Sequence, residues 1–297
     1  MRKKKNDENE LRYFFSKLNY FTKFFIKKNF PKIVKIFNII ISKKEKVTFK
    51  GWGMITFTSS PPWIENKDFY NKNSTEFSEI NNNLSKLMDN GSFFWSYFAA
   101  DDHKIILDEL KWRHYIVFMT SSYISNFTNS EEKILVECGA CDGVTAYYAM
   151  SNLQKKNLNF KCYLYDSWST IEKEKLTKSE KWLEGSYSYL DVDNTKKNLS
   201  TFNNNLIFNK GYIPQSFKTS SNPEIVSWLH VDLNSSIATT ETLKFFYDKI
   251  ESGGVILFDD YAYEGYEDTR IVVDDFLNNK NGQFFQLPTG QAIFFKK

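Results

Sequence analysis

The chain has 297 residues, of which 41% are hydrophobic and 25% charged, and this composition is typical of a globular protein with one large domain or two small ones. Three cysteines are too few for a disulfide framework and favour a reducing compartment. No apolar run approaches the roughly 20 residues that a membrane-spanning helix needs, and the N-terminus lacks the pattern of a signal peptide. We therefore expect a cytoplasmic protein that consists of one large domain and an N-terminal extension.

The extension, residues 1–50, carries the basic character of the chain. It holds 15 Lys or Arg against 4 Asp or Glu, a net charge of +11, so with +3 for the whole chain the remaining residues carry −8. Apolar residues at helical spacing predict an amphipathic, aromatic-rich helix that ends or kinks at Pro31; they are Leu11, Phe14, Phe15, Leu18, Phe21 and Phe25.

Three interpretations of this extension remain open. Residues 1–45 could dock peripherally on the anionic inner face of the membrane. They could instead pack on their own domain or on a second copy of the chain in a homo-oligomer, which we favour. No motif supports nucleic-acid binding, so no nucleic-acid partner is expected.

Residues 51–104 predict a loop and helix region. The segment 51–63 is rich in Gly, Pro and Trp and could cover a ligand site or plug the edge of the core. A helix is expected around Phe77–Met88, and another over Ile105–Ile124. Arg113 is the notable polar residue of the second helix, because it could reach a carboxylate group of a ligand, although an arginine on a solvated helix face is the commoner case.

The stretch Lys133–Val144, KILVECGACDGV, predicts a buried strand, a glycine turn and the start of a helix. Gly139 and Gly143 allow the backbone to turn tightly and to approach a ligand at the carboxyl end of the strand. Cys138 and Cys141 have CxxC spacing, but no second cysteine or histidine pair accompanies them. We interpret them as small turn residues and not as a zinc site.

Strands and helices alternate after this turn. Further strands are predicted at 162–165, 206–208, 228–232, 255–258, 284–287 and 292–295. Helices are predicted at 145–152, 194–202, 237–250 and 268–278, and a charged insertion at 171–185. Gly253-Gly254 is expected to end the helix 237–250. This order predicts an α/β fold with a mostly parallel sheet and an antiparallel pair at the end of the chain.

Acidic residues follow four of the predicted strands: Glu137, Asp166, Asp232 and the pair Asp259-Asp260. Asp166 stands where such folds hold ribose hydroxyls, or it could cap a helix together with Ser167. Three carboxylates that converge from neighbouring strands would repel one another, and a divalent cation such as Mg2+ would relieve this. Capping of helices or pairing with Lys or Arg is the alternative, which we favour less.

These motifs together resemble the class I S-adenosylmethionine-dependent methyltransferases of the macrocin O-methyltransferase (TylF/MycF/NovP-like) family. The resemblance covers about residues 105–297 and rests on VECGACDGVT, YDSW, LHVDLN, ESGGVILFDDY and LPTGQAIFFKK. It implies a Rossmann-like domain with a seven-stranded sheet whose last strand is antiparallel.

The resemblance also implies a set of site residues. S-adenosylmethionine would lie over Glu137–Gly143, with Asp166 on its ribose. We add Ser167 and Arg113 as further candidates for the cofactor site. Asp232, Asp259 and Asp260 would bind Mg2+ or another divalent cation. In this family the general base is the second aspartate of an Asp-x-Asp motif. Here the first position is Asp232 and the second is Asn234, which cannot accept a proton. His230 is the alternative base, although a lone strand histidine is more often a core residue.

The expected function is therefore metal-dependent O-methylation of a sugar, a glycosylated small molecule or a cell-surface glycan. The competing hypothesis is a catalytically degenerate methyltransferase fold that serves as a binding or membrane-docking module. The strand-end acids argue against this second hypothesis.

Overall fold

The computed structural model describes residues 72–96, 107, 110–219 and 221–297. The predicted extension, residues 1–50, and the loop 51–63 lie outside these described residues. Within the described part, no helix has the length and apolar character needed to cross a membrane.

Seven strands form one sheet. Its order is β3-β2-β1-β4-β5-β7-β6, from β1 (Lys133–Cys138), β2 (Phe160–Asp166), β3 (Leu206–Lys210), β4 (Val226–Val231), β5 (Ile250–Phe258), β6 (Gly282–Gln286) and β7 (Ala292–Lys296). The pairs among β1 to β5 are parallel, and β7 runs antiparallel to both β5 and β6. The predicted seven-stranded, Rossmann-like sheet with an antiparallel last strand is confirmed.

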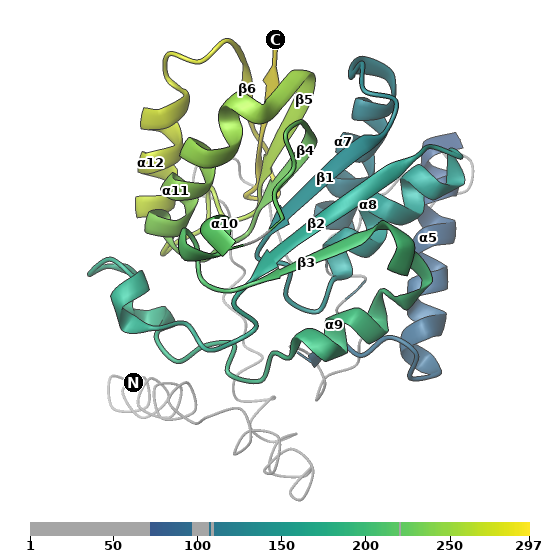
Figure 1. The fold of residues 1–297 in the computed structure, drawn as a ribbon, viewed down its shortest axis with the longest axis horizontal. Helices are drawn as coiled ribbons and strands as arrows, with labels where there is room; N and C mark the ends of the chain where they lie inside the picture. The colour runs from purple at the N-terminus through teal and green to yellow at the C-terminus, as the bar shows by residue number, and fades with distance from the viewer. Residues whose placement is uncertain (1–71, 97–106, 108–109, 220) are drawn as a thin grey trace, which may run out of the picture.

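Helices cover both faces of this sheet (Figure 1). The helices are α5 (Lys72–Asp89), α7 (Lys111–Phe127), α8 (Val144–Lys155), α9 (Val192–Asn198), α10 (Gln215–Thr219), α11 (Ser236–Phe246) and α12 (Glu267–Leu277). Helices α5, α7 and α8 share one core with the sheet, and α11 and α12 share the other. Because side chains alternate along a strand, neighbours such as Leu135 and Val136 enter opposite cores.

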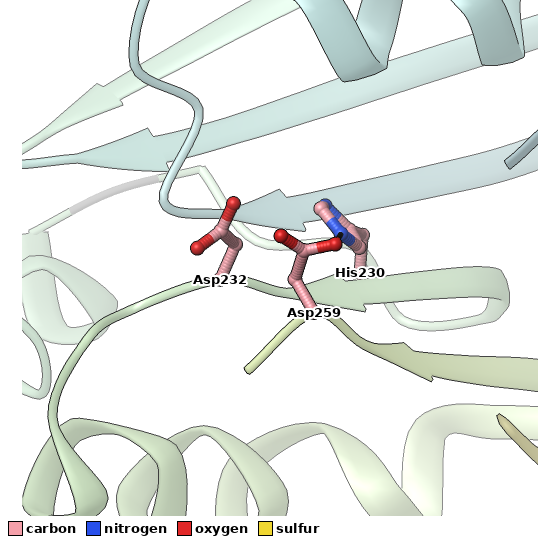
Figure 2. A group of neighbouring side chains, drawn as sticks. All are labelled: His230, Asp232 and Asp259. Atoms are coloured by element: carbon pink, nitrogen blue, oxygen red, sulfur yellow. Dashed lines mark ion pairs between the residues drawn. The ribbon is translucent and has the colours of Figure 1, made fainter. Parts of the chain in front are cut away.

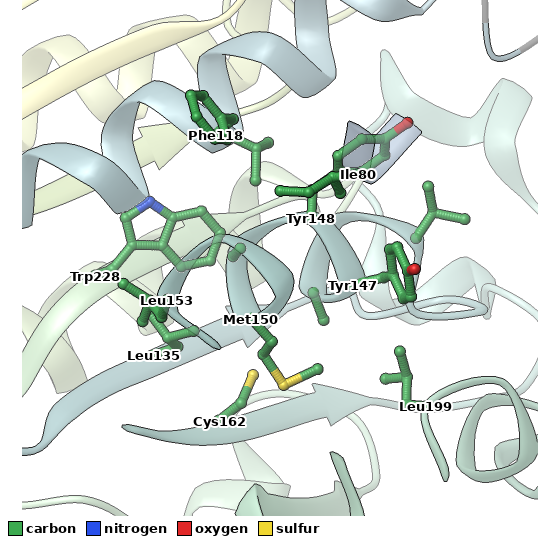
Figure 3. Packing of buried hydrophobic residues seen from close by; sticks show 14 of the residues in the cluster. Ile80, Phe118, Leu135, Tyr147, Tyr148, Met150, Leu153, Cys162, Leu199 and Trp228 are labelled. Carbon is green, nitrogen blue, oxygen red and sulfur yellow. The ribbon is translucent and has the colours of Figure 1, made fainter. Parts of the chain in front are cut away.

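The core under α7 and α8 combines aliphatic side chains with large aromatic rings (Figure 3). Trp228 of β4 is fully buried, and its indole nitrogen donates to Thr120 Oγ1 of α7 at 3.0 Å. Tyr148 of α8 is buried as well and donates to Asn81 Oδ1 of α5 at 2.6 Å. The indole nitrogen and the tyrosine hydroxyl both find a partner inside the core, so these two rings are buried without the cost of an unsatisfied donor.

The sequence prediction for Gly253 and Gly254 is corrected. Gly253 and Gly254 do not end a helix: α11 ends at Phe246, a 3₁₀ turn covers Tyr247–Lys249, and both glycines lie inside β5. Gly253 has φ +78°, and a Cβ there would lie 2.0 Å from the backbone oxygen of Phe127. Gly253 is therefore needed where the strand passes close to the end of α7.

The predicted charged insertion, residues 171–185, is an ordered loop with two 3₁₀ helices, Lys173–Lys175 and Glu180–Leu183. The Glu180 side chain is buried and accepts hydrogen bonds from the backbone nitrogens of Ser236 (2.7 Å) and Thr177 (2.9 Å). Since Ser236 opens α11, this carboxylate binds the positive end of the helix and fixes the loop beside the carboxyl edge of the sheet.

Candidate active site

A cavity of about 370 Å³ opens at the carboxyl ends of β1, β2, β4 and β5. One end is lined by the glycine turn, Asp166, Ser167 and Tyr212, and the other by Asp232, Asn234, Asp259, Asp260, Tyr187 and Tyr266; Arg113, His114 and Trp95 also contribute to its wall. This is where parallel α/β sheets bind ligands, and the volume falls in the usual range for small-molecule sites.

The two glycines of the turn have different roles. Gly139 has φ +95°, and a Cβ there would lie 1.6 Å from the backbone oxygen of Asp232, so the turn can cross β4 closely only with glycine at this position. Gly143 has φ +86° and packs against the Leu199 side chain, and it is not among the cavity-lining residues. Gly143 therefore shapes the start of α8 and does not face the predicted cofactor space.

Asp166 lines the cavity and also holds the turns around it. Its Oδ2 accepts a hydrogen bond from the backbone nitrogen of Cys141 at 2.8 Å, and its Oδ1 accepts one from that of Trp168 at 2.7 Å. Each carboxylate oxygen has a second lone pair, so the side chain can still accept two hydroxyl groups. The Ser167 hydroxyl donates to the backbone oxygen of Ser169 at 3.3 Å.

Arg113 lies at the acidic end of the cavity. Its guanidinium forms an ion pair with the Asp259 carboxylate, lies 3.8 Å from Asp260 Oδ1 and stacks 4.9 Å from the centre of the Tyr263 ring. The other oxygen of Asp259 accepts a hydrogen bond from the Gln291 amide at 2.8 Å. The alternative that we favoured less, pairing with a cation of the chain, therefore holds for Asp259 and Asp260.

Burial and mutual repulsion shift the charges of this cluster. Burial raises the pKa of Asp232 well above its ordinary value, and the neighbouring Asp260 raises it further. Burial also raises the pKa of Asp260, while Arg113 opposes that rise. For Arg113, burial lowers the pKa, but Tyr263, Asp260 and Asp232 outweigh it and raise the pKa overall. The positive charge of Arg113 and the raised pKa values of Asp232 and Asp260 thus both reduce the repulsion among these acids.

His230 and Glu137 form a buried pair beneath the cavity. The two side chains come from adjacent strands, with His230 Nδ1 at 3.0 Å from Glu137 Oε1. Burial lowers the pKa of His230 to about 3 and raises that of Glu137 well above its usual range. Glu137 lines the cavity, whereas His230 is fully buried, stacked on Trp228 and outside the lining.

The residues fit a divalent cation in their donor chemistry. Single ligand atoms of His230, Asp232 and Asp259 lie within 4.8 Å of one another (Figure 2). Nε2 of His230 is buried without a hydrogen-bond partner and lies 3.8 Å from Asp259 Oδ1. When Nδ1 carries the proton toward Glu137, Nε2 offers a lone pair, as in metal sites whose histidine is oriented by a carboxylate. The carboxylates suit Mg2+, and the imidazole also admits Mn2+ and related ions.

Asn234 is held between two tyrosines. It has φ +53°, its amide nitrogen donates to the Tyr187 hydroxyl at 3.2 Å, and its amide oxygen accepts from the Tyr266 hydroxyl. Tyr187 comes from the loop after β2 and Tyr266 from the segment before α12. The amide therefore joins two loops that border the cavity beside Asp232.

The sequence interpretation missed several lining residues. Gln291 belongs to the quoted motif LPTGQAIFFKK, but only the fold shows that this hairpin reaches Asp259. His114 lines the cavity wall, and its ring stacks on Tyr148 with centroids 4.5 Å apart. Tyr187 and Tyr266 carry no local signal, because an aromatic residue in a loop predicts no particular contact.

Comparisons with known proteins agree with this architecture. The family model described as Macrocin-O-methyltransferase (TylF) matches residues 127–287. The structure of the O-methyltransferase NovP is similar, with a TM-score of 0.55, 16% sequence identity and coverage of 64% of this chain and 81% of that chain.

Two further structures are more distant. The calicheamicin methyltransferase CalS11 has a TM-score of 0.46 at 10% identity, covering 83% of this chain and 98% of that chain. An O-methyltransferase from Bacillus cereus has a TM-score of 0.48 at 10% identity, covering 81% and 99%. No curated protein sequence matches the chain.

Proposed function

The chain belongs to the macrocin O-methyltransferase (TylF) family and is an O-methyltransferase, and from this premise we propose that it uses S-adenosylmethionine and a divalent cation to methylate a sugar hydroxyl. The acceptor would be a sugar, a glycosylated small molecule or a cell-surface glycan. The observation that carries the proposal is the cavity itself, which joins the glycine turn and Asp166 at one end to Asp232, Asp259 and Asp260 at the other.

The glycine turn and Asp166 would bind the donor. Both oxygens of Asp166 are fixed by backbone donors from Cys141 and Trp168, so the side chain is already oriented before a ligand arrives. Its remaining lone pairs can accept the two ribose hydroxyls. Bound S-adenosylmethionine supplies an electrophilic methyl group on sulfur.

The acids at the ends of β4 and β5 would orient the acceptor. Asp232 and Asp259, with His230 behind them, would hold a divalent cation, whose Lewis acidity would lower the pKa of an acceptor hydroxyl. Without the cation, Arg113 and Gln291 hold the Asp259 carboxylate from either side. Holding the hydroxyl in line with the methyl group contributes to the rate, because the displacement needs a defined approach.

The proton of the hydroxyl would pass to the Asp232 carboxylate. This carboxylate lines the cavity beside the proposed cation site, so it is placed to accept the proton of a hydroxyl that the cation has acidified. Asn234 cannot take that proton, and His230 lies beneath the lining. As the oxygen–carbon bond formed, the sulfur–carbon bond would break and S-adenosylhomocysteine would leave as a neutral thioether.

A methyl-transfer assay tests the proposal, with nucleotide sugars, glycosides and cell-surface glycans as acceptors. EDTA should abolish transfer, and Mg2+ or Mn2+ should restore it. Asp259→Asn should lower turnover by roughly a hundredfold or more, as expected when a group that stabilises developing charge is lost, while calorimetry should show little change in S-adenosylmethionine binding.

Asp275→Asn is the matched control, because Asp275 is an exposed acid on α12. Full activity in EDTA, with no metal found by elemental analysis, would remove the cation from the proposal and leave the methyl transfer in place. Tight donor binding without transfer to any acceptor would favour the alternative of a binding module.

A further inference from the structure

An exposed tryptophan lies against a tyrosine that lines the cavity. The Trp182 side chain belongs to the loop after β2 and is 58% exposed. Its ring meets the Tyr266 ring edge-on, with centroids 5.7 Å apart and an interplanar angle of 83°. Tyr266 lines the cavity, and its hydroxyl donates to Asn234. The two aromatic rings therefore connect the surface to Asn234 in the cavity.

The loop that carries Trp182 is firmly anchored. Thr177 and Ser179 donate from their hydroxyls to the Asp268 carboxylate at the start of α12. The Ser235 hydroxyl donates to the backbone oxygen of Lys175 at 2.7 Å, and the flanking Leu183 is buried. A tryptophan exposed on so constrained a loop keeps its position, and it offers a rigid apolar surface at little entropic cost to a ligand.

The Trp182 indole packs against the backbone at Gly265. Gly265 has φ +96°, and a Cβ built there would lie 3.2 Å from Cζ2 of Trp182. The indole therefore packs against the glycine along one part of the ring while more than half of the side chain stays in solvent. Phe127 is equally exposed at 58%, but it stacks on Tyr123, which does not line the cavity.

We infer that Trp182 and Tyr266 form a second saccharide subsite, which binds the sugar ring next to the one that is methylated. The faces of aromatic rings carry negative charge and attract the polarised C–H groups of a pyranose. The loop 171–190 holds 4 Lys and 4 Glu, so its formal charge is zero and it suits an uncharged glycan better than a sugar bearing a diphosphate. This subsite rests on the proposed function, and it makes the preferred acceptor an oligosaccharide or a glycoside with at least two sugars.

Kinetics on paired acceptors test the subsite. The probes are methyl pyranosides and disaccharides that carry the same terminal sugar, compared in the wild type, Trp182→Ala, Trp182→Phe and the control Phe127→Ala. Trp182→Ala should raise the KM for the disaccharide about tenfold and leave kcat and the monosaccharide kinetics within about twofold. Trp182→Phe should recover most of the affinity, because it keeps an aromatic face.

Binding measured without turnover separates this inference from the proposed function. With S-adenosylhomocysteine present, saturation-transfer NMR should show contact between the disaccharide and the wild type that weakens in Trp182→Ala and not in Phe127→Ala. That result supports the subsite even if no acceptor is methylated. Equal KM values in the wild type and Trp182→Ala, with methyl transfer intact, would overturn the subsite and leave the proposed function standing. So would equal losses in Trp182→Ala and Phe127→Ala.

Discussion

Arg113 of α7 forms an ion pair with Asp259, which follows β5, and its guanidinium also donates to the Asp259 backbone oxygen at 3.3 Å. The same guanidinium lies 3.8 Å from Asp260. A cation of the chain thus holds the acids that the proposed divalent cation would bind, and the two cations compete for the same carboxylate.

Replacing Arg113 should therefore have opposite effects on stability and on metal binding. In EDTA, Arg113→Gln should lower the free energy of unfolding by about 2 kcal/mol, because it leaves partly buried carboxylates without their counter-ion. Mn2+ should bind about tenfold more tightly, since it no longer displaces the guanidinium. Urea unfolding and calorimetry measure the two effects.

Arg270→Gln serves as the control, because Arg270 is exposed on α12. If Arg113→Gln loses stability and its Mn2+ affinity does not rise, then Arg113 does not compete with the cation and is a structural counter-ion only.

Gly139→Ala should disrupt the site far more than an ordinary glycine substitution. The added Cβ would meet the Asp232 backbone oxygen at 1.6 Å, so β4 would have to shift together with the acid that follows it. Gly185→Ala is matched in conformation, with φ +80° and no atom within 4 Å of the added Cβ. It should cost only the about 1 kcal/mol of a left-handed alanine.

We expect Gly139→Ala to cost at least about 3 kcal/mol of unfolding free energy in urea or to prevent folding. Similar stability of the two variants would show that the crossing of the turn over β4 is not tight.

Asp166→Ala should weaken S-adenosylmethionine binding by roughly 10- to 100-fold, because hydrogen bonds to a charged group contribute about 1.5–3 kcal/mol. The carboxylate also holds the backbone nitrogens of Cys141 and Trp168, so the substitution loosens both turns. Asp166→Asn separates the two roles, since its amide keeps one acceptor for the turns. Calorimetry of both variants, with thermal unfolding of the unliganded proteins, gives the comparison. Unchanged donor affinity in Asp166→Ala would remove this residue from the ribose site.

The two buried histidines should each contribute a loss of stability on acidification. Burial lowers the pKa of His114 from 6.5 to about 3, and His230 is lowered to a similar value. Each histidine binds its proton more weakly in the folded than in the unfolded state. The stability that this provides is present above pH 6.5 and is lost as the pH falls toward 3.

His114→Phe tests this window. Each histidine contributes a slope of about 1.4 kcal/mol per pH unit below its unfolded pKa, or about 2 kcal/mol between pH 6.5 and 5. Phenylalanine keeps the stacking on Tyr148 and removes the titration. Urea unfolding at pH 5–7 should show that the free energy of unfolding of this variant depends less steeply on pH than that of the wild type, by the equivalent of one proton. Carboxyl groups with raised pKa values act in the opposite sense in both proteins and cancel in the comparison. Parallel pH profiles would contradict the assignment.

The sequence alone determined the order of the strands along the chain, the glycine turn and the acids at the strand ends. These features are local: a β-branched run predicts a buried strand, and parallel strands must end at one edge of the sheet. The position of Asp166 beside the glycine turn follows from this order, because one crossover separates them.

The tertiary structure decided what each acid contacts. Arg113 precedes Asp259 by more than a hundred residues, and no periodicity links them, so only the packing of α7 against the sheet makes the pair. Likewise, the residues next to Gly253 in the sequence predict a helix end there. Its real constraint is the backbone of Phe127, which approaches from another element.

The same distinction separates His230 from Asp232. They lie two residues apart and therefore on one face of the chain, yet β4 ends between them, at Val231. His230 stays inside the sheet with Glu137, and Asp232 enters the cavity. The sequence marks both as candidates, and the end of the strand decides which one lines the cavity.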